Sequence, residues 1–206
     1  MDERSTKSKG PTSLHGLHRL QDFDYARAGA YFLTLVLEGR PHLMGEVAEG
    51  EMSLKDAGRV VADCWTDLPN HYPHVRLDAF VVMPNHVHGV LILSEENGIG
   101  LNDEVKAGLK PAPTKRHAVP EVVRGFKTFS ARCVNKSRRT LGCAVWQRNY
   151  YEHVIRDDRC LDRIREYIVD NPRRWNLDRE NPARTGRDEF DRWLESLPKP
   201  QPTSYP

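Results

Sequence analysis

The sequence predicts an α+β fold built on an antiparallel sheet. Short runs rich in aliphatic and β-branched residues are typical of strands, and they occupy residues 31–37, 75–83, 86–93 and 145–155. Two segments between them repeat apolar residues at helical spacing, over 54–68 and 122–133. Between residues 30 and 155 the elements therefore follow the order βαββαβ, the split βαβ arrangement of ferredoxin-like folds. An added C-terminal helix follows this unit.

The first strand leads into a short partner strand and then into the first helix. The partner strand is expected at 42–47, and Glu49-Gly50 turns the chain after it. Ser53-Leu54-Lys55-Asp56 is typical of a capping box, so it predicts the start of the helix. Apolar residues then recur at helical spacing, at Leu54, Ala57, Val61, Cys64 and Leu68.

The second half of the predicted sheet contains one tight turn and one long loop. Pro84-Asn85 is a turn-favouring pair, and it joins the strands at 75–83 and 86–93. Residues 94–120 are rich in glycine, proline and lysine and show little periodicity, which predicts a variable surface loop. The helix after that loop is marked by Val122, Phe126, Phe129 and Cys133.

One domain is expected for a chain of 206 residues and 23.7 kDa. We expect residues 1–20 to form a mobile tail and residues 21–180 to form the single domain. Residues 181–206 are expected to be a C-terminal extension that is partly disordered. No stretch approaches the ~20 apolar residues of a membrane span, so we expect a cytoplasmic protein without membrane contact. The four cysteines form no C-x-x-C pair, which predicts reduced thiols rather than structural zinc.

Charge is distributed unevenly, although the formal net charge is only +2. Residues 122–151 contain no Asp or Glu, while they carry Arg124, Lys127, Arg132, Lys136, Arg138, Arg139 and Arg148. A segregated basic zone of this kind is expected on a protein that binds phosphate backbones. A solvated helix face would explain the same pattern, and the charges alone do not choose between the two.

Two histidines lie in the most informative segment, residues 81–93. Because side chains alternate along a strand, His86 and His88 point to the same face, roughly 6.5–7 Å apart. That spacing allows both imidazoles to bind one metal ion. The alternative is a pair of core or surface histidines that hydrogen bonds satisfy.

The added helix carries a second group of polar residues. Asp157 or Asp158 can cap its start, and a core stripe recurs at Leu161, Ile164 and Ile168. Pro172 ends the helix, because proline disfavours the helical conformation of the residue before it. Tyr167 and Asn171 lie one turn apart on one face, with Arg163 one turn earlier. The alternative is that Tyr167 packs at the boundary of the core with its hydroxyl in water.

Together these motifs resemble the REP-associated tyrosine transposases, which use one tyrosine and a histidine-hydrophobe-histidine metal site. The resemblance runs from about residue 22 to 176. It rests on Gly29-Ala30-Tyr31-Phe32-Leu33-Thr34, Phe80-Val81-Val82-Met83-Pro84-Asn85-His86-Val87-His88, Gly125-Phe126-Lys127, Val145-Trp146-Gln147-Arg148-Asn149-Tyr150-Tyr151-Glu152-His153, Ile164-Arg165-Glu166-Tyr167-Ile168 and Asn171-Pro172. One variation concerns Asn171, where some relatives of the wider superfamily carry glutamine.

The resemblance implies a metal-dependent endonuclease and strand transferase that acts on single-stranded DNA at palindromes or hairpins. Tyr167 would attack phosphorus and form a 5′-phosphotyrosine, while His86, His88 and Asn171 would bind Mg²⁺ or Mn²⁺. The residues expected to contact DNA are Arg124, Lys127, Arg132, Lys136, Arg148 and Arg163. Such a protein would be cytoplasmic and associated with the bacterial nucleoid.

Several alternatives stay open from the sequence. Tyr150 and Tyr151 are rival nucleophiles, although neither has a polar ligand one turn away. A second hypothesis is a non-catalytic, domesticated protein that binds single-stranded nucleic acid. A third hypothesis is a metal phosphohydrolase that uses activated water. The sequence offers no obvious general base for Tyr167, although Lys127 or Arg163 could lower its pKa. The active site is completed either within one chain or across a homodimer.

Overall fold

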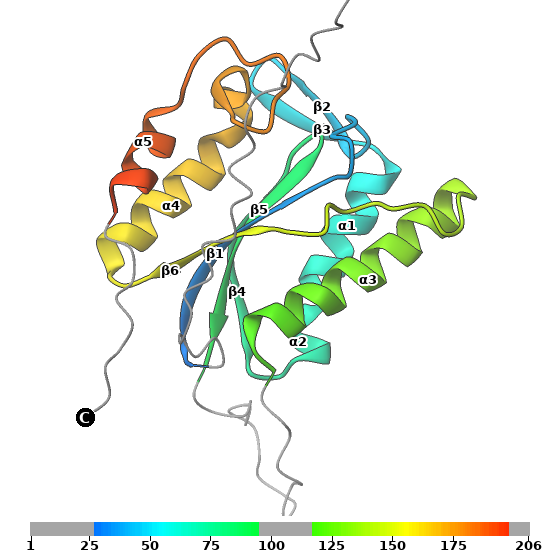
Figure 1. Cartoon of the computed structure of the whole chain (residues 1–206), viewed down its shortest axis with the longest axis horizontal. Helices are drawn as coiled ribbons and strands as arrows, with labels where there is room; N and C mark the ends of the chain where they lie inside the picture. The colour runs from blue at the N-terminus through cyan, green and yellow to red at the C-terminus, as the bar shows by residue number, and fades with distance from the viewer. Residues whose placement is uncertain (1–26, 95–116, 198–206) are drawn as a thin grey trace, which may run out of the picture.

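A four-stranded antiparallel sheet forms the centre of the computed structural model, which describes residues 27–94 and 117–197 (Figure 1). Its strands are β1 (Gly29–Val36), β4 (Val75–Val82), β5 (His86–Leu93) and β6 (Tyr151–Ile155). They lie side by side in the order β4-β5-β1-β6, and each neighbouring pair is antiparallel. The predicted α+β class with a βαββαβ core is therefore confirmed.

Helices cover both faces of the sheet. On one face α1 (Asp56–Thr66) and α3 (Val119–Arg138) pack against each other, with the short α2 (Leu68–His71) beside them. On the other face lie α4 (Asp158–Asp170) and α5 (Glu189–Ser196) (Figure 1). The structure thus has three layers, and the sheet separates two groups of core side chains.

Alternation along the two central strands assigns each side chain to one of these layers. In β1, Leu33 and Leu35 belong to the core under α1 and α3, whereas Phe32 packs toward α4. In β5, Val87 lies in the first core and Val90 in the second. His86 and His88 have the same parity as Val90, so both histidines face the layer of α4.

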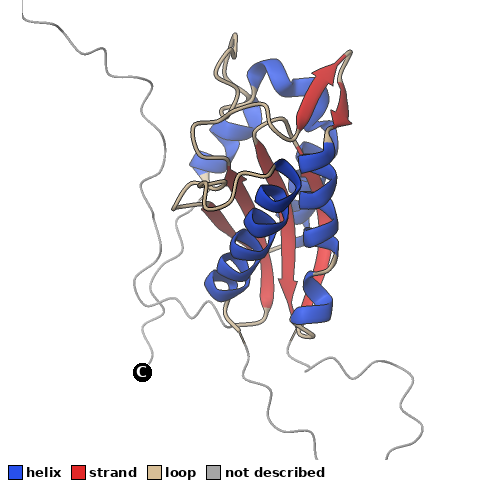
Figure 2. Ribbon diagram, turned by 90° about the vertical axis from the view of Figure 1, so that its right-hand side faces the viewer, coloured by secondary structure: helices blue, strands red, loops and turns tan. Residues whose placement is uncertain are grey.

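A small hairpin stands at one end of the sheet (Figure 2). Strands β2 (Gly45–Ala48) and β3 (Glu51–Leu54) form it, and Glu49 and Gly50 make its turn with φ angles of 53° and 79°. The predicted capping box is wrong, because Ser53 belongs to β3 and α1 begins at Asp56 without a side-chain cap. Pairing between β2 and β3 outweighs the local capping signal.

The last strand is shorter than the sequence suggests. Instead of starting at residue 145, β6 starts at Tyr151, and Trp146 forms an isolated bridge with Leu37. Trp146 lies in the core under α3, where its Nε1 donates a hydrogen bond of 2.9 Å to Ser130 Oγ. The apolar residues 145–146 are therefore buried by the helix rather than by a continuous ladder.

The C-terminal helix forms as expected and then continues in a tighter form. Asp157 caps α4 by accepting a hydrogen bond of 2.8 Å from the Cys160 amide. Pro172 ends the α-helix but lies in the first turn of a 3₁₀ helix, η1 (Asn171–Leu177).

Within 27–94 and 117–197, no helix is both long enough and apolar enough to cross a membrane. The predicted tail at 1–20, most of the loop at 94–120 and residues 198–206 lie outside the described residues.

Candidate metal and tyrosine site

His86 and His88 converge at the beginning of β5. Their side chains are 0% and 2% exposed, and their Nε2 atoms lie 3.0 Å apart. Two imidazole nitrogens approach this closely only with a proton or a cation between them. The same-face placement predicted from the strand spacing is therefore confirmed, and the two ligand atoms aim at one point.

Neighbouring polar groups hold the far side of each imidazole ring. Nδ1 of His86 lies 2.9 Å from Asn85 Oδ1, an acceptor, so Nδ1 carries the proton. Asn85 is held in turn, because its Nδ2 donates to the Glu180 carbonyl over 2.8 Å. Nδ1 of His88 lies 2.9 Å from the Thr34 hydroxyl on the neighbouring strand. Such partners orient a ligating histidine and leave its Nε2 for a metal.

Asp178 adds a carboxylate that the sequence did not predict. It follows η1 directly and is 1% exposed, and its Oδ2 lies 3.7 Å from His86 Nε2 and 3.6 Å from His88 Nε2. Its other oxygen accepts a hydrogen bond of 2.7 Å from the Glu180 amide. The possible signal in the sequence was an acid placed shortly after Asn171, but no periodicity links the two positions.

These donors fit a divalent cation. The ligand atoms of His86, His88 and Asp178 all lie within 4.8 Å of one another. Ligand distances of about 2.1 Å at right angles bring two neighbouring donors to about 3 Å, close to the separation of the imidazoles. Asn171 is fully buried beside them, its Nδ2 donates to Asp178 Oδ2 over 2.9 Å, and its Oδ1 has no hydrogen-bond partner among the described residues. Nitrogen and oxygen donors without thiolate suit magnesium or manganese, and they also accept zinc.

The charge state of the cluster favours metal binding. Burial lowers the pKa of His86 to about 3, with His88 and Arg40 acting in the same direction against Asp178. Burial alone would raise the pKa of Asp178, but the adjacent His86 and His88 and the hydrogen bond from Asn171 bring it below its usual value. Near neutral pH the site therefore offers a neutral imidazole and an ionised carboxylate, the forms that ligate metals.

Tyr167 brings its hydroxyl to the same cluster from α4. The hydroxyl lies 3.3 Å from His88 Nε2 and donates to Asp178 Oδ2 over 3.2 Å. Burial raises the pKa of Tyr167 well above its usual value, and the carboxylates of Asp178, Asp191 and Asp188 add to this effect. The two motifs recognised separately in the sequence thus meet in one buried site.

A ring from α5 covers the tyrosine. Phe190 stacks on Tyr167 with ring centroids 3.7 Å apart and planes at 6°, and Tyr167 is 4% exposed. Asp188 caps α5 by accepting from the Phe190 amide over 2.7 Å, and it also pairs with Arg174. The ion pair between Arg179 and Asp191, at 3.1 Å, fastens the same helix. Sequence reasoning missed this cover.

The basic residues singled out in the sequence are not gathered around Tyr167. Arg124, Arg132, Lys136 and Arg148 are exposed on α3 and on the segment after it. Lys127 turns inward, and its Nζ donates to the carbonyls of Gln147 and Asn149 over 2.9 Å each. Arg163 lies on α4 above the Trp193 ring, 4.5 Å from its centroid.

The rival tyrosines occupy other surroundings. Tyr150 lies under the Lys127 ammonium, which is 5.2 Å from its ring centroid. Tyr151 packs edge-on against Phe32 with centroids 6.2 Å apart, and burial raises its pKa to about 12. Of these three tyrosines, Tyr167 brings its hydroxyl to the histidine cluster.

Fold and site together define a class: a ferredoxin-like domain with a buried His-His-Asp cluster and a tyrosine hydroxyl against it. No family model matches the chain. The chain belongs to one family with an uncharacterised protein of Haemophilus influenzae, 36% identical over 162 residues that cover 78% of this chain and 89% of that protein. It is also 29% identical, over 150 residues, to a protein of the same organism named "Putative REP-associated tyrosine transposase", covering 72% of this chain and 73% of that protein. The resemblance to REP-associated tyrosine transposases is confirmed.

The chain is also similar to two solved structures. One is a REP-associated tyrosine transposase bound to a REP hairpin, with a TM-score of 0.44, 16% identity and coverage of 72% of this chain and 68% of that chain. The other is a putative transposase from Deinococcus radiodurans, with a TM-score of 0.43, 20% identity and coverage of 69% of this chain and 90% of that chain.

Proposed function

We propose that this protein is a metal-dependent, transposase-like endonuclease and strand transferase for single-stranded DNA. In this proposal Tyr167 attacks phosphorus at palindromic or hairpin DNA and forms a 5′-phosphotyrosine. The observation that carries it is the position of the Tyr167 hydroxyl, 3.3 Å from His88 Nε2 and hydrogen-bonded to Asp178. This position brings a phenolic oxygen to the point where three potential metal ligands converge, which is the arrangement that a metal-assisted attack by tyrosine requires.

His86, His88 and Asp178 would hold the metal, with Asn171 Oδ1 as a further donor. A bound divalent cation supplies neutralisation of the phosphate oxygens and stabilisation of the leaving oxygen. Tyr167 would form the new O–P bond while the bond from phosphorus to the 3′ oxygen breaks, and the leaving oxygen would take up the proton that the phenol loses, which gives a free 3′-OH. The phosphotyrosine keeps the energy of the phosphodiester, so a 3′-OH can later reverse the step and join strands.

The protein's own groups position the Tyr167 phenol but do not promote its ionisation. With a pKa of ~10, a phenol is about one-thousandth ionised at pH 7, a handicap of roughly 4 kcal/mol. Burial increases this handicap for Tyr167. The hydrogen bond to Asp178 keeps the hydroxyl oxygen where the histidine and amide donors converge, which is an orientational contribution to the rate.

A second candidate is a non-catalytic binding protein for single-stranded nucleic acid. One observation favours it: Tyr167 is 4% exposed beneath Phe190, so no phosphate can reach its oxygen in this conformation. The exposed arginines of α3 are compatible with either function. The two candidates differ in one respect, because catalysis requires Tyr167 to become accessible and binding alone does not.

The decisive experiment looks for a covalent adduct. The protein is incubated with single-stranded palindromic DNA and Mn²⁺, and an SDS-resistant adduct is expected at Tyr167 by mass spectrometry. Tyr167→Phe should abolish the adduct while DNA binding persists, and Tyr151→Phe, on the same face of the sheet, should retain it. EDTA, His86→Ala or His88→Ala should abolish cleavage, because each removes the bound cation.

Each of the other possible outcomes supports a different function. Cleavage without any adduct supports a metal phosphohydrolase that uses activated water. DNA binding with neither cleavage nor adduct, in Mg²⁺ and in Mn²⁺, supports the non-catalytic candidate. A 3′-phosphate link, or an adduct at Tyr150 or Tyr151, would refute the proposed role of Tyr167.

A further inference from the structure

We propose that the outer face of α3 is a separate contact surface for a single DNA strand, on the side of the sheet opposite to Tyr167. We call it the α3 surface, and it consists of Tyr72, Arg124, Thr128, Phe129 and Arg132. The arginines bind phosphates of different nucleotides, and Phe129 stacks on an unpaired base. This inference rests on the proposed function in one respect, since it takes the same substrate class.

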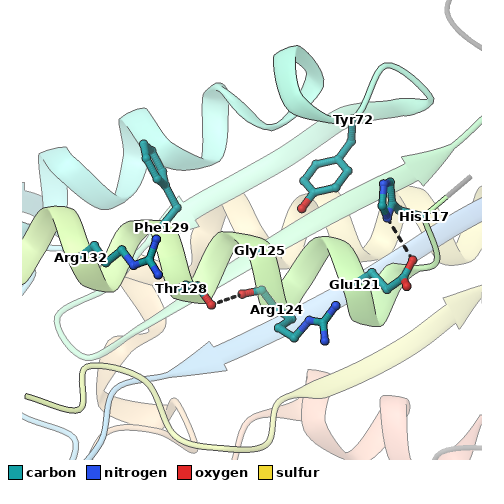
Figure 3. A pocket seen from close by; sticks show the side chains of 8 residues that line it. All are labelled: Tyr72, His117, Glu121, Arg124, Gly125, Thr128, Phe129 and Arg132. Carbon is teal, nitrogen blue, oxygen red and sulfur yellow. Dashed lines mark hydrogen bonds and ion pairs between the residues drawn. The ribbon is translucent and has the colours of Figure 1, made fainter. Parts of the chain in front are cut away.

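The α3 surface lines an open hollow of about 330 Å³ between α3 and the end of α2 (Figure 3). Its remaining lining residues are His117, Glu121 and Gly125. Gly125 forms part of the floor, because a Cβ atom there would lie 2.1 Å from the Tyr72 hydroxyl. The glycine therefore lets the tyrosine ring lie against the helix, and the hydroxyl faces the hollow.

Positive charge follows one line of the helix. Arg124, Thr128 and Arg132 are spaced four residues apart, so they share one side of α3, and Figure 3 shows the two arginines on either side of Thr128. Eight residues of helix span about 12 Å, which places the guanidinium groups at different nucleotides of an extended strand. Neither arginine forms an ion pair with any residue of 27–94 or 117–197.

Beyond its first turn, α3 itself contributes no acidic group to this surface, and the nearby carboxylate of Asp67 is paired with His71 at 2.8 Å. Residues 122–151 contain no Asp or Glu. The one carboxylate that lines the hollow belongs to Glu121, which accepts from the Ala118 amide over 3.3 Å and contacts His117 Nδ1 at 3.1 Å. This carboxylate therefore caps the first turn of α3 and lies at the edge of the α3 surface.

An aromatic ring stands beside the arginines. Phe129 is 47% exposed and contacts the ring of His71 with centroids 5.9 Å apart, which leaves much of the ring accessible. Arginines would also attract an acidic protein, but stacking platforms interleaved with basic side chains are typical of single-strand binding sites. Every base offers a π-face, so we expect this contact to tolerate any sequence.

The position of the surface separates binding from chemistry. α3 covers the face of the sheet opposite to His86 and His88 (Figure 1). Residues 139–150 lead from α3 to the edge strand β6 and carry the exposed Arg148. A strand bound on α3 would therefore pass around the β6 edge to reach Tyr167, and the two contacts can be tested separately.

The test measures binding of a 20-nucleotide fluorescein-labelled oligo(dT) by anisotropy in EDTA, where no cleavage is expected. Phe129→Ala should weaken binding by at least about fivefold. Each phosphate contact contributes about 0.7 to the slope of log affinity against log salt, so Arg124→Gln with Arg132→Gln should reduce that slope by about 1.4. Val169→Ala, an apolar side chain that is 72% exposed on α4, and Arg156→Gln with Arg159→Gln are the matched controls.

Photo-crosslinking decides the location directly. An oligonucleotide with 5-iodouracil should crosslink at Phe129 or Tyr72, and Phe129→Trp should preserve affinity because it preserves a stacking ring. Wild-type affinity in Phe129→Ala, an unchanged salt slope in the double variant, or crosslinks confined to the α4 face would overturn the inference. Adduct formation at Tyr167 is scored separately, so a failure of the α3 surface and a failure of catalysis are distinguishable.

Discussion

The ring of Tyr167 lies face to face with the ring of Phe190, 3.7 Å away between centroids. The same tyrosine donates its hydroxyl hydrogen bond to Asp178. One residue therefore has its oxygen at the ligand cluster and its ring beneath α5. Any reaction of Tyr167 with a phosphodiester requires α5 to move, because both rings are nearly inaccessible.

Phe190→Ala tests whether α5 limits access to Tyr167. Large-to-small substitution of a buried phenylalanine costs about 3–5 kcal/mol, and here much of that loss weakens the docking of α5. We expect the rate of adduct formation per folded molecule to rise by at least about tenfold, since a smaller free energy separates the covered and uncovered states.

The control for Phe190→Ala is an equally buried residue of the other core. Leu91→Ala should destabilise the protein without changing the adduct rate per folded molecule, because Leu91 packs under α1 and α3. Folded fractions come from circular dichroism. A Phe190→Ala variant that reacts no faster than the wild type would show that α5 does not restrict the site.

Asp178→Asn tests the carboxylate that sequence reasoning missed. It keeps the size of the side chain but removes the charge that lies 3.6–3.7 Å from both histidine nitrogens. We expect Mn²⁺ affinity, measured by calorimetry, to fall by at least about tenfold. Asp170→Asn, at the end of α4 and with its side chain 48% exposed, should leave it unchanged. Equal affinities in the two variants would remove Asp178 from the ligand set and leave Asn171 as the third donor.

The parts of the site that lie on regular elements were predictable from the sequence. Alternation in β5 placed His86 and His88 on one face, and helical spacing placed Tyr167 beside Asn171. Each pattern involves residues that are close in sequence. The regular geometry of a strand or helix then determines which of their side chains lie on the same face.

The remaining parts depend on contacts that have no period. Asp178 reaches the histidines through a 3₁₀ turn, and Phe190 reaches Tyr167 only after the chain has reversed along α4. At Ser53 the sequence contained a signal that the structure does not follow. The residues there favour a helix cap, but Ser53 instead pairs with Glu46 in the β2–β3 hairpin. Irregular backbone and tertiary pairing are the two places where local sequence rules carry the least information.

Stability should depend on pH through the buried histidines. The pKa of His86 is lowered to about 3, chiefly by burial, so the unfolded chain binds a proton below pH 6.5 that the folded protein does not. The free energy of unfolding is therefore greatest above pH 6.5 and falls as the pH drops toward 3. At pH 5 the loss is about 2 kcal/mol for each histidine that stays neutral. His153, with a pKa of about 4, acts in the same direction.

Urea denaturation in EDTA at pH 7.5 and pH 5 measures this effect. His86→Gln should show a smaller loss of unfolding free energy between the two pH values, because one buried titrating group has been removed. Leu141→Gln, at a non-titrating side chain that is 84% exposed, should show the wild-type loss. The same loss in both variants would mean that His86 is protonated in the folded protein at pH 5.

Lys127 gives the last prediction, since its surroundings differ from those expected for a DNA contact. Its ammonium donates to three carbonyls, of Gln147, Arg148 and Asn149, at 2.9, 3.3 and 2.9 Å. Burial lowers its pKa to about 8, so the charge is held inside the protein at neutral pH. Lys127→Met should therefore cost about 1–3 kcal/mol of stability by leaving these carbonyls unpaired, while the salt slope of DNA binding changes little. Lys136 is exposed on α3, one turn beyond Arg132. Lys136→Met should therefore have the reverse effect: stability is kept, and the salt slope of DNA binding falls by about 0.7. If Lys127→Met lowers the slope as much as Lys136→Met does, the ammonium leaves its carbonyls for phosphate when DNA binds.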